Sequence, residues 1–385
     1  MTRALRIAIL AHSTNPRGGV VHALELGDAL TRLGHEAVVH APDAKGGGFF
    51  RPTLCGTVSV PAAPAGADVT AMVHQRVADY LSYFDAPRHR AFDVFHAQDG
   101  ISGNALASLR ERGLITRFAR TVHHVDAFAD PALLDLQRRA IVSADRHFVV
   151  SHLWQEQLAE MFGLRATLVG NGVDTHHFTP VADGRETQLK ARLGLGAGPV
   201  VLSVGGVEAR KNTLRILEGF IQLRAVHPKA QLVIAGGATV LDHKTYFDQF
   251  AAALGASGLP SDAVIRTGPL PQDDMPALYR LANVLAFASV KEGFGLVALE
   301  AMACGLPVVV SRIAPFTEHI GEDEAVWCNP MSPPSIANAL AVALAPGLAP
   351  RLRTIGPAVA ARHDWATTAR AHLATYEDLR EPLHA

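Results

Sequence analysis

Short apolar runs alternate with helical periodicity along the first half of the chain. Residues 7–10 form a compact apolar run, which is typical of a strand buried on both faces of a sheet. After a polar loop at residues 12–19, apolar side chains recur every three or four positions and predict one face of a helix, namely Ala23, Leu26, Leu30 and Leu33. Gly34 marks the expected end of this helix, and residues 37–39 read as the next strand. Such a strand-helix-strand unit predicts a parallel sheet with right-handed crossovers.

The same alternation continues and then restarts in the second half. Further strands are expected at residues 93–96, 121–123, 147–151, 200–204, 231–235, 264–266, 284–288 and 308–310. Residues 179–199 carry Pro, Gly and polar residues and predict a connection with a short helix. The chain is therefore expected to be an α/β protein of two doubly wound domains, residues 1–178 and 179–363. Ligands of such sheets bind beyond the carboxyl ends of the strands, so the cleft between the domains is the default site.

Composition limits the classes of partner and compartment. The 385 residues are 49% hydrophobic and 18% charged, which allows two domains with cores of their own. A formal net charge of -1 implies no overall attraction to nucleic acid or to an anionic membrane. Cys55, Cys304 and Cys328 form no Cys-x-x-Cys pair, and no run of 18 uncharged apolar residues occurs. We expect a cytoplasmic protein with no nucleic-acid partner and at most peripheral membrane contact.

The segment 289–307 carries the strongest chemical signal. It follows an expected strand and opens a helix, and Gly293 and Gly295 allow backbone to approach a ligand without an intervening Cβ. The unpaired amides at residues 294–297 would then face that ligand with the positive end of the helix dipole. This arrangement predicts a phosphate or anion site.

A lone carboxylate lies in the same helix. Glu300 is the only charged residue between Glu292 and Arg312. Burying a carboxylate without a partner costs on the order of several kcal/mol. Helical side chains lean toward the helix N-terminus, so Glu300 would lean toward the same ligand. The two hydroxyls of a ribose would satisfy it. The competing interpretation is a surface glutamate that follows an ordinary Gly-rich turn.

These residues resemble the signature of a known enzyme family. Glu292 and Glu300, with Glu-Gly-Phe-Gly-Leu and Glu-Ala-Met-Ala-x-Gly-x-Pro-Val-Val around them, are similar to the retaining GT-B glycosyltransferases of family 4, group 1. Matches extend over nearly the whole chain, at Gly18-Gly19, Thr121-Val122-His123, Asn171-Gly172-Val173-Asp174, residues 276–283 and Trp365 with the helix after it. The sequence resembles a poorly characterised subgroup of this family, so the resemblance does not identify the substrate.

The resemblance implies an architecture. It is the GT-B fold, with two Rossmann-like domains facing across a cleft and a C-terminal helix, at about residues 364–385, that crosses back to the first domain. The first domain would bind the acceptor, through the loop of Arg17, Gly18 and Gly19, residues 46–51 and the variable region 60–90. The second domain would bind the nucleotide sugar.

The resemblance also implies roles for single residues. Glu292 would hold hydroxyls of the transferred sugar, Lys211 would neutralise the leaving diphosphate, and His123 would line the sugar pocket. Glu318 lies where the family often keeps a glutamate. The implied donor-binding positions are Glu300, Gly293, Phe294, Gly295, Leu296, Gly205 and Arg210.

One position departs from the family pattern. The family usually has an arginine for the diphosphate where this sequence has Gly206. Arg210 or Arg17 could supply the second cation, or Lys211 could act alone. The departure bears on catalytic strength, because one charge on a leaving group is worth roughly 3–4 kcal/mol by analogy with oxyanion donors.

The expected activity is glycosyl transfer (EC 2.4, of the hexosyltransferase type) from a nucleotide-diphosphate sugar to a hydroxyl. By resemblance, configuration would be retained, a donor phosphate oxygen would take the proton, and neither a metal nor another cofactor would be needed. The alternatives are a sugar-nucleotide epimerase of GT-B fold and a catalytically decayed nucleotide-sugar binder. The base of the donor stays open, and the acceptor can be a small molecule, a glycan or a lipid.

Overall fold

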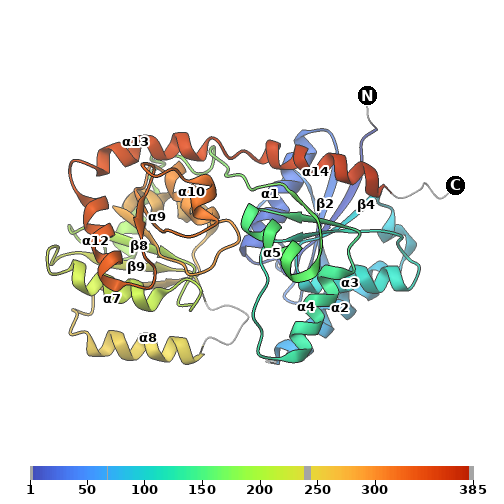
Figure 1. Cartoon of the computed structure of the whole chain (residues 1–385), viewed down its shortest axis with the longest axis horizontal. Helices are drawn as coiled ribbons and strands as arrows, with labels where there is room; N and C mark the ends of the chain where they lie inside the picture. Colours follow the sequence, from blue (N-terminus) through green and yellow to red (C-terminus); the bar gives the residue numbers. More distant parts are fainter. Residues whose placement is uncertain (1–2, 67, 238–243, 381–385) are drawn as a thin grey trace. The chain divides into compact units, whose positions relative to one another are not determined.

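The computed structural model describes residues 3–66, 68–237 and 244–380 and divides into two compact units. The first unit contains Met1–Gly172 together with Asp364–Ala385, and the second contains Val173–His363. The chain therefore leaves the first unit after Gly172, earlier than the expected boundary at residue 178. Figure 1 shows the two units with their strands and helices.

The sheet of the first unit has seven parallel strands in the order β3-β2-β1-β4-β5-β6-β7. The strands are β1 (Arg6–Leu10), β2 (Glu36–Asp43), β3 (Gly56–Pro61), β4 (Val94–Ala97), β5 (Ala119–Val122), β6 (Arg146–Val149) and β7 (Ala166–Leu168). The sequence analysis missed the two edge strands, because β3 carries few apolar residues and β7 has only three residues. The strand order reverses direction at β1 and β4, and the loops after these strands form the expected ligand-binding edge.

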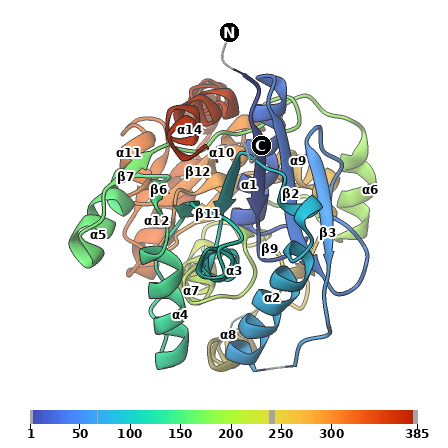
Figure 2. The same cartoon turned by 90° about the vertical axis from the view of Figure 1, so that its right-hand side faces the viewer.

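Helices cover both faces of this sheet (Figures 1 and 2). Helix α3 packs against both α2 and α4, and α1 packs against α14. The helices of the unit are α1 (Gly18–Arg32), α2 (Val69–Phe84), α3 (Gly100–Glu111), α4 (Pro131–Val142), α5 (His152–Phe162), α14 (Trp365–Leu379) and the short η1 (Pro87–Arg90). Gly34 has a φ of 89°, which confirms its expected place beyond the end of α1.

The second unit repeats the architecture with six parallel strands in the order β10-β9-β8-β11-β12-β13. The strands are β8 (Val200–Val204), β9 (Gln231–Ala235), β10 (Val264–Gly268), β11 (Val284–Phe287), β12 (Val308–Ser311) and β13 (Val326–Cys328). The helices are α6 (Arg185–Arg192), α7 (Thr213–Leu223), α8 (Lys244–Ala256), α9 (Met275–Leu281), α10 (Leu296–Ala303), α11 (Phe316–His319), α12 (Pro333–Leu344), α13 (Ala349–Ala360) and η2 (Gln272–Asp274). All expected strands of this half are present, and the three-residue β13 was missed.

The C-terminal helix belongs to the first unit, as the resemblance implied. Gly172 lies so close to Trp365, at the start of α14, that an added Cβ would be 2.5 Å from the Trp365 nitrogen. The indole of Trp365 also meets the imidazole of His22 on α1, with ring centroids 5.4 Å apart. These contacts hold the first turn of α14 against Gly172 and α1.

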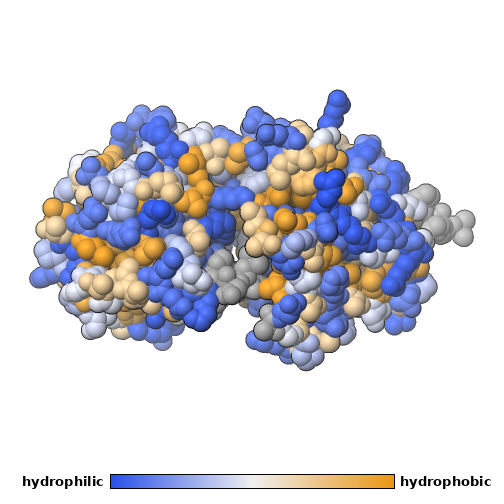
Figure 3. All heavy atoms as spheres, turned by 60° about the horizontal axis from the view of Figure 1, so that its bottom comes forward, coloured by the Kyte–Doolittle hydropathy of each residue, from blue (hydrophilic) through white to orange (hydrophobic). Residues whose placement is uncertain are grey.

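The surface mixes apolar and hydrophilic residues. On the face drawn in Figure 3, apolar side chains form small patches among hydrophilic ones. Within the described ranges, no single helix has the length and apolar composition needed to cross a membrane. One pair of segments, Pro333–Leu344 with Ala349–Leu379, meets that test only when taken together across a bend of 94°.

Candidate active site

The loop after β8 places Lys211 in the second unit. Gly205 and Gly206 have φ values of 123° and 76°, which L side chains rarely adopt. Both amides donate to the carbonyl of Ala235 on β9, and the hydroxyl of Thr213 donates to the Gly206 carbonyl over 2.9 Å. The loop is therefore fixed to the neighbouring strand and to the first residue of α7.

The packing around this loop explains the departure from the family pattern. A Cβ at Gly206 would lie 2.7 Å from the carbonyl oxygen of Gly237, and a Cβ at Gly205 would lie 2.7 Å from Cε of Lys211. No arginine side chain fits at position 206 unless the loop changes its path.

Lys211, Glu292 and Arg210 form a charge cluster. Lys211 Nζ lies 2.7 Å from Glu292 Oε1, and Arg210 Nη1 lies 2.9 Å from Glu292 Oε2. Lys211 Nζ also lies 4.4 Å from the centre of the Phe287 ring, which faces it. The structure thus brings together Lys211, Arg210 and Glu292, residues separated by about 80 positions in the sequence.

The Glu292 carboxylate stays ionised at neutral pH. Burial alone would raise the pKa of Glu292, but the charges of Lys211 and Arg210 outweigh it and lower that pKa to about 2. Burial lowers the pKa of Lys211, and the Glu292 carboxylate opposes this shift. Of the two cations considered as replacements for the family arginine, Arg210 lies in this cluster, whereas Arg17 lies in the other unit.

The predicted anion site begins α10. Leu296 is the first helical residue, and Gly293, Phe294 and Gly295 lead into it after β11. Gly295 has a φ of 99°, and a Cβ there would lie 2.4 Å from the Phe316 ring. Gly295 therefore serves a close ring contact and a left-handed backbone, in addition to the ligand approach that the sequence suggested.

A histidine supports this loop from α11. The imidazole of His319 stacks on the Phe294 ring with centroids 4.3 Å apart and planes inclined by 4°. The sequence analysis missed His319, because only its neighbour Glu318 matches a family position. Glu318 is exposed in the structure.

Glu300 has a protein partner that the sequence analysis also missed. The hydroxyl of Tyr279, on α9, donates a hydrogen bond of 2.7 Å to Glu300 Oε2. Burial raises the pKa of Glu300, while this hydrogen bond and the charge of Lys211 oppose the shift. Tyr279 was noted only as part of a motif, although a lone carboxylate in an apolar helix already called for a donor. The bond occupies one oxygen of Glu300 and orients the carboxylate.

The first unit carries the remaining predicted residues. His123 directly follows β5, and its Nε2 lies 3.1 Å from Oε1 of Gln98 after β4. Burial lowers the pKa of His123 well below its ordinary value, so the imidazole is neutral at pH 7. Gly18 and Gly19 begin α1, and Arg17 occupies the N-cap position without a capping hydrogen bond from its side chain. A Cβ at Gly18 would meet nothing within 4 Å. The first turn of α1 is thus open above Gly18.

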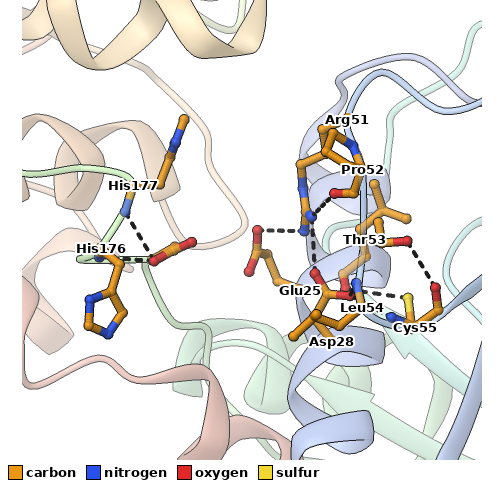
Figure 4. A network of polar contacts seen from close by, with 11 residues as sticks. Glu25, Asp28, Arg51, Pro52, Thr53, Leu54, Cys55, His176 and His177 are labelled. Carbon is orange, nitrogen blue, oxygen red and sulfur yellow. Dashed lines mark hydrogen bonds and ion pairs between the residues drawn. The ribbon is translucent and has the colours of Figure 1, made fainter. Parts of the chain in front are cut away.

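A predicted acceptor loop is fixed to α1 (Figure 4). Arg51, at the end of residues 46–51, lies 2.7 Å from Glu25 and 3.0 Å from Asp28. Asp28 Oδ1 also accepts hydrogen bonds from the amides of Leu54 and Cys55, of 2.7 and 2.9 Å. The buried Asp28 carboxylate therefore anchors both the end of this loop and the chain that leads to β3.

Comparison with known proteins places the chain in a family. The model described as "Glycosyltransferase Family 4" matches residues 16–177, and that described as "Glycosyl transferases group 1" matches residues 185–355. The D-inositol 3-phosphate glycosyltransferase of Acidothermus cellulolyticus is 32% identical over 74% of this chain and 67% of that protein. The chain belongs to the family 4 glycosyltransferases.

Solved structures of other glycosyltransferases and synthases share its fold. Sucrose-phosphate synthase from Thermosynechococcus elongatus superposes with a TM-score of 0.77 at 23% identity, over 97% of this chain and 98% of that one. The Anabaena protein HepE, solved with UDP-glucose, gives 0.75 at 18% identity, over 97% and 100%. A mannosyltransferase of Mycolicibacterium smegmatis, named as GDP-mannose-dependent and acting on phosphatidylinositol monomannoside, is 31% identical over 63% of each chain. This glycosyltransferase therefore has the GT-B fold of two Rossmann-like domains.

The packing at Gly206, where the family usually has an arginine, can be tested by measuring the stability of variants. Gly206→Ala is expected to lower the free energy of unfolding of the second unit by roughly 2–4 kcal/mol, the sum of left-handed strain and displaced backbone. Gly194→Ala is the matched control, because Gly194 has a φ of 63° and open space where a Cβ would lie. Urea unfolding of both variants separates strain from the clash. An equal loss in the two variants would show that the contact with Gly237 gives way freely.

Proposed function

We propose that this glycosyltransferase moves a sugar from a nucleotide-diphosphate sugar to a hydroxyl of its acceptor, with retention of configuration. The observation that carries the proposal is the Lys211–Glu292–Arg210 cluster in the unit that also holds the α10 N-terminus and Glu300. A diphosphate needs cations and backbone amides, and a ribose and a hexose need carboxylates to accept from their hydroxyls. This set contains each of these groups.

The proposed chemistry separates charge at the anomeric carbon. The bond between that carbon and the diphosphate oxygen breaks, so positive charge develops on the sugar and negative charge on the leaving group. Lys211 and the amides at the start of α10 stabilise the leaving group, while Glu292 holds sugar hydroxyls. The acceptor oxygen bonds to the carbon on the face that the diphosphate leaves, and its proton passes to a phosphate oxygen. His123, neutral at pH 7, accepts or donates one hydrogen bond to the sugar without carrying charge.

The relatives guide the choice of substrates. UDP-glucose is bound in the HepE structure, and GDP-mannose is named for the mycobacterial mannosyltransferase, so UDP and GDP sugars are the first donors to test. An inositol phosphate or another phosphorylated polyol is the first acceptor class, because inositol 3-phosphate recurs in the names of the relatives. We also propose a cytoplasmic location, with Cys55, Cys304 and Cys328 as buried free thiols. Metal independence is tested by turnover in EDTA.

Nucleotide binding tests the donor site directly. UDP, GDP, ADP and dTDP are each added at saturation to wild type, Glu300→Ala and Tyr279→Phe. A ligand at about 100 times its dissociation constant adds roughly 2.7 kcal/mol of stability. We expect one nucleotide to raise the melting temperature of wild type, Glu300→Ala to lose that increase, and Tyr279→Phe to keep part of it. Tyr246→Phe is the control, since the Tyr246 hydroxyl accepts from the Leu214 amide, whereas the Tyr279 hydroxyl donates to Glu300. Absence of any shift in wild type would contradict the proposed donor site.

A further inference from the structure

The first unit contains a buried arginine with two nitrogens that have no hydrogen-bond partner. Arg120 lies on β5 with only 6% of its surface exposed, and its Nε and Nη1 are buried without a hydrogen-bond partner. Among the described arginines, the other nitrogen of this kind is Nη2 of Arg280, which still forms an ion pair with Asp183 at 3.0 Å. The buried Arg76 is paired with Asp79. Arg120 therefore differs from the other buried arginines in the part of the chain that the structure describes.

This arrangement costs stability in the ligand-free protein. Burial lowers the pKa of Arg120 to about 10, and the Asp99 carboxylate opposes the shift, so the guanidinium stays charged at pH 7. A buried charge with unsatisfied N–H groups is unfavourable, and such groups in native proteins usually have a functional cause. The unused donors call for an acceptor that the chain itself does not supply.

An unused acceptor lies at the same edge of the sheet. Ala97 of β4 is in register with Arg120, so Asp99, two residues further along, follows on the same side of the sheet. Asp99 Oδ1 accepts from the Ser102 amide over 2.8 Å and caps α3, but Oδ2 is buried without a hydrogen bond. His12 Nδ1, after β1, lies 3.6 Å from that oxygen. The side chains of Asp99 and His12 keep 20% and 25% of their surface exposed, so solvent reaches part of each side chain.

We propose that Arg120 and Asp99 form an acceptor subsite for a phosphorylated polyol. Arg120 donates hydrogen bonds to the phosphate, and Asp99 Oδ2 accepts one from a neighbouring hydroxyl of the same molecule. The N-terminus of α3, next to Asp99, adds a field that favours the anion. The subsite rests on the proposed function, which supplies the acceptor that occupies it. It assigns a substrate class, because a neutral sugar leaves the guanidinium unpaired and a simple anion leaves the Asp99 oxygen unpaired.

Calorimetric binding of three probes tests the subsite. D-inositol 3-phosphate, myo-inositol and inorganic phosphate are titrated into wild type, Arg120→Met, Asp99→Asn and the control Arg146→Met, with UDP present and absent. Arg146 is exposed at the start of the neighbouring β6. We expect inositol phosphate to bind wild type and the control, and Arg120→Met to weaken it about 10- to 100-fold, the range for hydrogen bonds to a charged group. Asp99→Asn should weaken inositol phosphate but not inorganic phosphate.

Stability supplies a second measurement that does not depend on the choice of probe. Ligand-free Arg120→Met is expected to melt at a higher temperature than wild type, because methionine fills much of the space without a buried charge. Equal binding by wild type and Arg120→Met, or a lower melting temperature for ligand-free Arg120→Met, overturns the proposal. Binding of UDP without binding of any phosphorylated probe also overturns it. If UDP does not bind and inositol phosphate binds in a way that depends on Arg120, the proposed donor is wrong but the acceptor subsite stands. Vesicles of phosphatidylcholine with and without phosphatidylinositol distinguish a lipid headgroup from a free polyol phosphate.

Discussion

Replacing Lys211 with methionine is expected to lower kcat by roughly 10²- to 10³-fold, the cost of losing one preorganised charge at a developing anion. Methionine keeps most of the aliphatic stem, which is buried between the Gly205 turn and the Phe287 ring, and removes only the charge. Because Lys211 acts on charge that develops in the transition state, KM should change much less than kcat. The assay is the release of UDP or GDP from the donor that the binding panel selects.

Two controls separate catalysis from folding in this experiment. Lys190→Met removes an exposed lysine from α6 of the same unit and should leave kcat within about threefold, the usual effect of an exposed charge. Lys211→Met leaves Glu292 paired with Arg210 at 2.9 Å, and the double variant with Glu292→Gln removes both charges of the pair. The double variant should melt close to the wild-type temperature, even where Lys211→Met melts lower, and it should stay inactive. Wild-type kcat in well-folded Lys211→Met would sink the assigned role.

The sequence predicted those features that depend on neighbours along the chain. Apolar runs and helical periodicity located most strands, and the glycines around Phe294 located the start of α10, because both signals are local. The edge strands β3 and β7 were not predicted, because an edge strand needs neither a long apolar run nor burial on both faces. The fold class and the second-unit motifs were thus readable from the chain alone.

The partners within the site depend on packing and could not be predicted in this way. The Tyr279 bond to Glu300 joins two helices, and the contact that excludes a side chain at Gly206 comes from Gly237, after another strand. From the sequence, Arg210, Arg17 or Lys211 alone could supply the cation for the diphosphate, and the ion pair of Arg210 with Glu292 becomes visible only once the path of the loop after β8 is known. Arg120 gave no signal at all, because an arginine in a strand is unremarkable until its lack of partners is known.

Acidification from pH 7 to pH 5 is expected to destabilise the first unit by several kcal/mol, before most carboxylates titrate. Burial lowers the pKa of His22 and of His40 to about 4, and that of His372 to about 3, each from 6.5 in an unfolded chain. Below pH 6.5 the unfolded state therefore binds protons that the folded state excludes, so stability falls with pH until the folded values are reached. Each histidine contributes on the order of 2 kcal/mol at pH 5, from 1.36 kcal/mol per pH unit.

Urea unfolding followed by the fluorescence of Trp154 and Trp365, both in the first unit, measures this loss at pH 7, 6 and 5 when Trp327 of the second unit is replaced by phenylalanine. His40 lies among aromatic rings, and His40→Phe removes one titrating group. The free energy of unfolding of this variant should fall less steeply as the pH is lowered, because unfolding takes up about one proton fewer. His176→Phe, at an exposed position, should keep the wild-type slope. Carboxylates held ionised by partners, such as Glu292 with its pKa of about 2, lose their stabilising charge only at lower pH, so the upper window isolates the histidines. A wild-type stability that stays constant between pH 7 and 5 would mean that these imidazoles gain protons without unfolding, and hence that water reaches them in the folded protein.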